Sequence, residues 1–156
     1  MSMHGSKMPM KAVTKTLSSP EEMVQFGKEV ARFACSGMVL ALRGDLGAGK
    51  TTFLKGFISA LTGVDPLLIV SPTFHYLQAY EGCGFDIYHF DLYRVQSYEQ
   101  FARAGFTDYL ETGGICCFEW AERLGSHLPK GAYILELAYT GEGVRTATLL
   151  QQGETL

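Results

Sequence analysis

Residues 44–51 read Gly44-Asp45-Leu46-Gly47-Ala48-Gly49-Lys50-Thr51, which satisfies the pattern G-x-x-x-x-G-K-[ST] at every fixed position. The run before it, residues 38–42, is continuously apolar, as is typical of a strand buried on both faces. After it, apolar residues recur at helical spacing from Phe53 to Leu61, and Gly63 is placed to end that helix. The glycine-rich stretch therefore joins a buried strand to a helix.

This arrangement predicts a site for the phosphates of a nucleotide. Glycines let successive backbone N–H groups turn toward an anion, and the start of the helix adds its dipole. We expect Lys50 to bind the β and γ phosphates and the hydroxyl of Thr51 to ligate Mg²⁺. A glycine turn followed by a chance Lys-Thr is the competing interpretation, and the flanking strand and helix count against it. The sequence contains no asparagine, so the Asn-Lys-x-Asp element that reads guanine is absent and ATP is predicted.

Two acidic residues end apolar runs and are candidates to hold Mg²⁺ beside the glycine loop. Glu119 follows the four apolar residues 115–118, and we favour it as the metal ligand. Asp91 ends the less uniform run 87–90, and we expect it to orient water or to share the magnesium shell. A helix or turn cap beside Arg94 is the alternative role for Asp91.

Further candidates carry weaker signals. Ser71-Pro72-Thr73 stands where such proteins sense the γ-phosphate, and the Thr73 hydroxyl is able to contact nucleotide or metal, although a plain turn also explains this stretch. Trp120, the single tryptophan, follows Glu119 and packs over the site or presents a surface to a partner, although a half-buried core residue is the default interpretation. His75 and His89 are interpreted as satisfied structural histidines, because no third ligand has matching spacing.

The remaining pattern predicts an α/β fold of the P-loop NTPase type. We expect a mostly parallel central sheet flanked by helices, with an antiparallel strand pair at the C-terminus. The expected elements are an edge strand at 11–17, a helix at 20–35 opened by Ser19, a hairpin of 74–80 with 85–92, a helix from Ser97 to near Gly105, a strand at 115–118 and a terminal strand pair at 133–139 and 144–150.

Length, charge and composition limit which kinds of protein this chain can be. The 156 residues fit one domain at 11–150, with flexible ends at 1–10 and 151–156. The formal charge of −3 predicts no basic nucleic-acid face, and no apolar run approaches the roughly 20 residues that span a bilayer. The four cysteines lack metal or disulfide spacing and are interpreted as small, reduced apolar residues. We therefore expect a cytoplasmic protein without membrane contact.

Four motifs together carry a family resemblance: residues 44–52, ending in Thr52; residues 70–74, Val-Ser-Pro-Thr-Phe; residues 88–94, Tyr-His-Phe-Asp-Leu-Tyr-Arg; and Glu119-Trp120. Their order and spacing resemble the TsaE (YjeE) family over about residues 17–145. The resemblance implies a bacterial ATPase of tRNA threonylcarbamoyladenosine formation. Ala121 departs from the proline that the family often has after the tryptophan, which leaves the turn after Glu119 less defined.

The resemblance also implies partners and residue roles. It implies that ATP hydrolysis supports TsaB and TsaD in modifying adenosine 37 of tRNAs that read ANN codons, with tRNA contacted through the complex. Thr51 and Glu119 are implied as magnesium ligands, Asp91 and Trp120 as residues that matter for activity, and the chain near Pro20 as a neighbour of the nucleotide base. The resemblance places Thr52 inside the nucleotide-binding motif.

Two other functions stay open for a P-loop chain of this size. A small-molecule kinase needs several arginines to clamp a phosphoryl acceptor, and the six arginines here form no cluster in sequence. A nucleotide-binding scaffold that never hydrolyses ATP is the third possibility.

Overall fold

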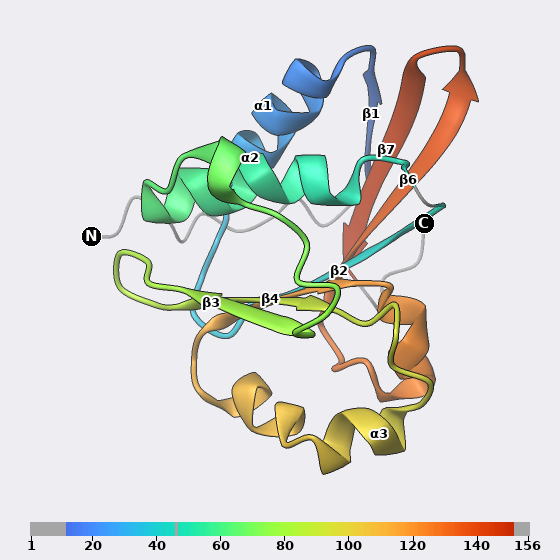
Figure 1. Ribbon diagram of the computed structural model, residues 1–156. Helices are drawn as coiled ribbons and strands as arrows, with labels where there is room; N and C mark the ends of the chain where they lie inside the picture. Colours follow the sequence, from blue (N-terminus) through green and yellow to red (C-terminus); the bar gives the residue numbers. More distant parts are fainter. Residues whose placement is uncertain (1–11, 46, 152–156) are drawn as a thin grey trace.

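A computed structural model describes residues 12–45 and 47–151 (Figure 1). The expected flexible ends lie outside these residues, apart from Gln151, which ends the last strand. Leu46 of the glycine loop also lies outside them.

The described residues form one seven-stranded sheet in the order β1-β7-β6-β2-β5-β4-β3. Its strands are β1 (Val13–Leu17), β2 (Val39–Gly44), β3 (Leu77–Tyr80), β4 (Ile87–Asp91), β5 (Ile115–Glu119), β6 (Tyr133–Gly141) and β7 (Val144–Gln151). The four central strands, β6, β2, β5 and β4, run parallel, whereas β3 and the β1–β7–β6 group pair antiparallel. The predicted parallel centre, edge strand and C-terminal strand pair are confirmed.

Helices cover both faces of the sheet. The helices are α1 (Pro20–Ala31), α2 (Lys50–Thr62) and α3 (Tyr98–Arg103), with 3-10 turns η1 (Pro66–Leu68), η2 (Phe106–Glu111) and η3 (Ala121–His127). Helices α1 and α2 lie on one face, and α3 lies on the other (Figure 1). Ser19 and Ser97 cap α1 and α3, as predicted, by accepting hydrogen bonds from the N–H groups of Glu22 and Gln100.

Two apolar clusters hold these layers together. Alternate residues of β2 point to opposite faces, so Leu40 and Leu42 pack with Phe53 and Phe57 of α2, whereas Ala41 belongs to the cluster around α3 and η3. Because β2 is buried on both faces in the middle of the sheet, the loop that follows it starts from a fixed point.

Some predicted boundaries were wrong. Helix α1 ends at Ala31 rather than near residue 35, because the next N–H groups bond to carbonyls three residues back and tighten the chain, as Phe33 N does to Val30 O. The strand expected from residue 74 begins at Leu77, since the Pro72 carbonyl accepts hydrogen bonds from His75 and Tyr76 and closes a turn there. The other expected elements lie within a few residues of their predicted bounds.

All four cysteines are free, and they divide into two kinds. Cys116 and Cys117 are buried in β5, and burial raises the pKa of the Cys116 thiol to about 12. Cys35 and Cys83 are exposed, so the prediction of small apolar residues is correct only for the first pair. Across the described ranges, no helix has the length and apolar character needed to cross a membrane.

Candidate nucleotide site

The glycine loop connects β2 to α2 with a backbone that requires glycine at two positions. Gly44 has φ +145°, and a Cβ there would lie 2.5 Å from the Leu137 carbonyl oxygen. Gly49 has φ +109°, and a Cβ there would lie 2.9 Å from Cε of Met23. Both conformations are rare for residues that carry a side chain. The loop is therefore shaped by its glycines and closed in by β6 and α1.

The start of α2 differs from the starts of α1 and α3. No side chain caps it, and its first turn contains no acidic residue, whereas the other two helices each have a serine cap and glutamate in the first turn. Its first N–H groups have no partner within the helix, and the helix dipole places partial positive charge there. This end of α2 is therefore suited to bind an anion.

Lys50 is the first residue of α2, and only 5% of it is exposed. Its Nζ donates a hydrogen bond of 2.5 Å to the Gly44 carbonyl and lies 3.9 Å from the centre of the Trp120 ring. Trp120 holds this position with a left-handed backbone, φ +61°, which is uncommon for a residue other than glycine. The cation is thus fixed between the loop and the indole, and Trp120 packs over Lys50, as one of the roles considered for it requires.

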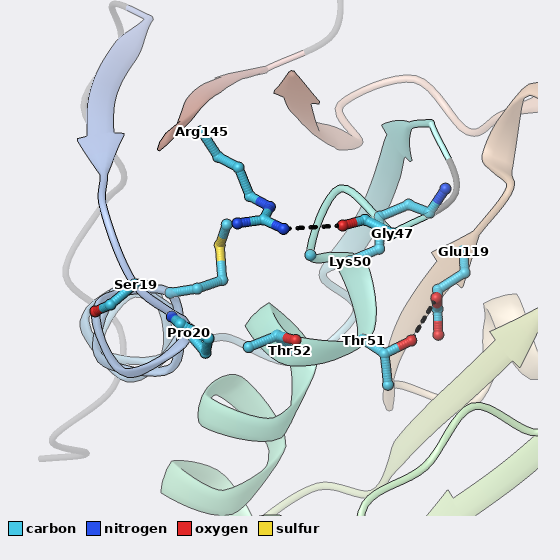
Figure 2. Close-up of a pocket in the computed structure, with 10 residues that line it drawn as sticks. Ser19, Pro20, Gly47, Lys50, Thr51, Thr52, Glu119 and Arg145 are labelled. Carbon is cyan, nitrogen blue, oxygen red and sulfur yellow. Dashed lines mark hydrogen bonds between the residues drawn. The ribbon is translucent and has the colours of Figure 1, made fainter. Parts of the chain in front are cut away.

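Glu119 is buried at the end of β5 and divides its two oxygens between two partners. Thr51 donates its hydroxyl hydrogen to Oε1 over 2.9 Å (Figure 2), and His89 Nε2 lies 2.6 Å from Oε2. The predicted metal ligands Thr51 and Glu119 are therefore in direct contact. Both supply hard oxygen atoms, which are the ligands that Mg²⁺ prefers.

Asp91 lies beside Glu119, because β4 and β5 run parallel and pair these two residues. Its Oδ2 accepts hydrogen bonds from the hydroxyls of Ser71 and Thr73, the latter over 2.9 Å. Its Oδ1 accepts from the N–H of Tyr93 over 2.9 Å. One oxygen thus caps the turn after β4, as the alternative interpretation expected, while the other holds the 71–73 loop at the edge of the sheet.

A pocket of about 190 Å³ opens beside these residues. Its lining joins predicted site residues with new ones: Ser19, Pro20, Met23, Gly47, Gly49, Lys50, Thr51, Thr52, Glu119 and Arg145. In Figure 2, Ser19 and Pro20 lie on one side of the site and the Thr51–Glu119 pair on the other. The structure therefore brings the start of α1, the glycine loop and the end of β5 together.

Other predicted site residues do not line this pocket. Asp45 is exposed, Ala48 is fully buried, and Gly44 takes part through its carbonyl. Asp91 and Thr73 lie next to the pocket through Glu119 rather than in it.

The oxygens of Thr51 and Glu119 are suited to a magnesium ion that is also bound by phosphate groups. They are too few to hold a metal ion without such additional ligands. Among the described residues, no three or more His, Cys, Asp or Glu side chains gather in a way that would hold a metal ion. A site with one carboxylate and one hydroxyl leaves most of the coordination sphere of Mg²⁺ to phosphate oxygens and water, which is its usual mode in nucleotide sites.

Besides Ser19 and Met23 of the pocket lining, three side chains near the glycine loop and Glu119 were not predicted as site residues. His89 was interpreted as a satisfied structural histidine, but its Nε2 pairs with Glu119 and its buried Nδ1 has no partner among the described residues. Arg145 lines the pocket, and Tyr139 contacts Gly47. The spacing of two between His89 and Asp91 was a usable signal for His89, whereas Arg145 lies far from the glycine loop in sequence.

The chain is similar to known proteins in sequence and in fold. Residues 17–147 match the family model described as "Threonylcarbamoyl adenosine biosynthesis protein TsaE". The proteins named tRNA threonylcarbamoyladenosine biosynthesis protein TsaE from Bacillus subtilis and Treponema pallidum are 35% and 37% identical to this chain. These alignments cover 92% and 84% of the chain, and 89% and 95% of the relatives.

A solved structure is also similar to this chain. The crystal structure of Bacillus subtilis YdiB matches with a TM-score of 0.75 and 33% identity, covering 94% of this chain and 90% of that one. The fold and the glycine loop define an α/β protein with a P-loop NTPase-like fold. Within that class, the family match over most of its length shows that the chain belongs to the TsaE family.

Proposed function

We propose that this protein binds ATP with Mg²⁺ and hydrolyses the nucleotide during formation of threonylcarbamoyladenosine at position 37 of tRNAs that read ANN codons. It does so in the cytoplasm with TsaB and TsaD, and contacts tRNA through their complex. The observation that carries the ATPase assignment is the contact between Thr51 and Glu119 beside the uncapped start of α2. The names of the relatives support the pathway.

Different groups of the protein bind different parts of the nucleotide. Backbone N–H groups at the start of α2 bind phosphate oxygens, and Lys50 adds a cation held in place by Gly44 and Trp120. The Thr51 hydroxyl and the Glu119 carboxylate hold Mg²⁺, which when bound offsets the negative charge of the β and γ phosphates. Pro20 and Ser19 form the opposite wall and lie beside the nucleoside.

Asp91 acts on the attacking water through its position at the same edge of the sheet. The carboxylate accepts hydrogen bonds from the hydroxyls of Ser71 and Thr73 and is paired in register with Glu119, so it ties the 71–73 loop to the strand ends that carry the proposed metal ligand. A fixed carboxylate and fixed hydroxyls orient water without reorganising during the reaction, which is how such groups lower a barrier.

A small-molecule kinase is less well supported by the pocket. Phosphoryl transfer to a metabolite needs several cations around the acceptor, and of the residues that line the pocket only Lys50 and Arg145 are basic. Hydrolysis needs fewer charges, because the acceptor is water.

The test is phosphate release by the purified protein, alone and with TsaB and TsaD added. We expect slow hydrolysis by the protein alone and a marked increase with the partners. Lys50→Ala removes the cation and should abolish both rates, whereas Arg103→Gln, an exposed position on α3, should change neither.

Each alternative predicts a different result in the same assay. A scaffold binds ATP but releases no phosphate under any condition. A kinase would convert metabolites to phosphorylated products, and adding TsaB and TsaD would not change its rate. Either result would overturn the proposal.

A further inference from the structure

The ends of β6 and β7 next to their connecting turn contact the glycine loop. Tyr139 and Arg145 are directly paired across these two strands, next to an irregularity in their register. The Tyr139 hydroxyl donates to the Gly47 carbonyl over 2.5 Å. Arg145 Nη2 donates to the same oxygen over 3.2 Å, as Figure 2 shows. Arg145 also lies over the Tyr139 ring, 4.7 Å from its centre, and bonds to its hydroxyl. The pair is thus a fixed unit outside the loop.

The guanidinium of Arg145 has donors left over after these contacts. Nη2 serves both the Gly47 carbonyl and the Tyr139 hydroxyl. Nε is buried and has no partner among the described residues. Protein atoms shield Nε from the pocket, whereas Nη1 makes no hydrogen bond within the described residues. Its two N–H donors therefore remain for an acceptor in the pocket.

The surroundings of Arg145 indicate what that acceptor is. The side chain lines the pocket between Gly47 and the start of α1, with its Cδ 3.6 Å from where a Cβ on Gly49 would lie. Lys50 lies in the same pocket, and Glu119 is the single acidic residue of the lining. A planar cation with free donors next to a phosphate-binding loop matches the oxygens of a phosphate chain.

We infer that Arg145 is a further nucleotide-binding residue, which binds phosphate oxygens from the side of the loop opposite the Thr51–Glu119 pair. Tyr139 is a positioning residue, which holds the guanidinium and the loop in register. This assignment rests on the proposed function, because it takes the pocket to be the nucleotide site.

A purely structural role for Arg145 makes a different prediction. If its only task were to hold the Gly47 carbonyl, Tyr139 would do the same task, and losing either side chain would affect binding equally. If Arg145 binds phosphate, its charge and donors matter beyond that contact, and the effect follows the phosphate chain rather than the base or ribose.

The experiment measures dissociation constants by calorimetry for ATP, ADP and inorganic tripolyphosphate, which lacks base and ribose. Arg145→Gln should weaken all three ligands by a similar factor, about ten- to a hundredfold, as expected for one charge-assisted hydrogen bond. Arg145→Lys keeps the charge and should recover part of the loss. Tyr139→Phe should weaken binding by a smaller factor. Arg103→Gln removes the same charge from exposed α3 and should have no effect.

Thermal unfolding of each variant shows that the fold is kept. Wild-type affinity in Arg145→Gln would overturn the inference and leave the proposed function standing. So would equal losses in Arg145→Gln and Tyr139→Phe, or a loss for ATP without a loss for tripolyphosphate. A wild-type protein that binds none of the three ligands would instead overturn the proposed function.

Discussion

The two carboxylate oxygens of Glu119 contact two different residues, Thr51 and His89. Replacing the glutamate by glutamine removes the negative charge and keeps the size and shape of the side chain. In Glu119→Gln the amide keeps an oxygen for Thr51 and a donor for a neutral His89, so the fold is expected to survive. The negative charge that holds Mg²⁺ is lost. We expect ATP hydrolysis to fall about a hundredfold or more, while ATP affinity measured without Mg²⁺ changes little.

The measurement is phosphate release and ATP binding, each with and without Mg²⁺. The matched control is Glu122→Gln. Glu122 is an exposed residue of η3, three positions after Glu119, and the substitution removes the same charge outside the site. Normal magnesium-dependent turnover in Glu119→Gln would show that another group holds the metal.

Asp91 offers a second test, because both of its oxygens are in use. An amide has one acceptor oxygen where a carboxylate has two. In Asp91→Asn the oxygen can accept from the Tyr93 N–H only with the NH2 group facing the Ser71 and Thr73 hydroxyls, which must then accept instead of donate. We expect single-turnover hydrolysis to slow about ten- to a hundredfold, while ATP affinity stays within about threefold, because Asp91 does not line the pocket.

Thr73→Val removes one hydroxyl and keeps the carboxylate, which isolates the contact with the loop. It should slow hydrolysis by a smaller factor than Asp91→Asn. A loss of affinity larger than the loss of rate in Asp91→Asn would assign this residue to binding rather than to chemistry.

At the scale of elements, helices α1 and α2 touch through their backbones. A Cβ on Gly56 would lie 1.9 Å from the Val24 carbonyl oxygen, and a Cβ on Gly27 would lie 2.2 Å from that of Phe53. Neither position leaves room for a methyl group. The two glycines thus set the distance between the helix that carries Pro20 and the helix that carries Lys50.

Gly56→Ala is therefore expected to destabilise the protein by about 1–3 kcal/mol, the usual cost of forcing extra atoms into a packed interior. In an exposed helix the same change stabilises by about 1 kcal/mol, so the two cases differ in sign. Urea unfolding of Gly56→Ala and of the control Ser59→Ala on the same helix measures the difference. A Gly56→Ala variant as stable as wild type would show that the helices separate at no cost.

Helices and strands were predictable where nearby residues in the sequence mark their ends or their burial. The serine caps of α1 and α3, the glycine that ends α2, and the apolar run of β5 each lie within a few residues of the element they define. The end of α1 and the start of β3 were placed wrongly, because backbone hydrogen bonds, rather than side-chain pattern, decide where those segments stop and start.

At the scale of the whole molecule, the sheet order brings distant residues together. Lys50, Thr51 and Glu119 were predictable, because a glycine loop needs a carboxylate from a neighbouring buried strand. Arg145 was not, since its approach to Gly47 depends on β6 lying next to β2 and β7 lying outside β6. No spacing rule along the chain contains that information, and a single sequence leaves the strand order open.

This assembly predicts how nucleotide affects stability. The pocket is lined by the start of α1, the glycine loop, β5 and β7, so a bound ligand ties together segments from both ends of the described chain. A ligand at a hundred times its dissociation constant adds about 2.7 kcal/mol to the free energy of unfolding. For a chain of this length, that corresponds to a rise in melting temperature of roughly 5–10 °C.

Thermal unfolding with increasing MgATP measures this rise, and Lys50→Ala at the same concentrations is the paired variant. Lys50 is the cation that the loop and Trp120 hold in place, so its loss should remove most of the rise. Arg103→Gln should keep all of it, since that exposed side chain lies on α3, on the other face of the sheet from α1 and α2 (Figure 1). An equal rise in Lys50→Ala would mean that ATP binds elsewhere on the protein, because a ligand stabilises a fold only through contacts that the unfolded chain cannot make.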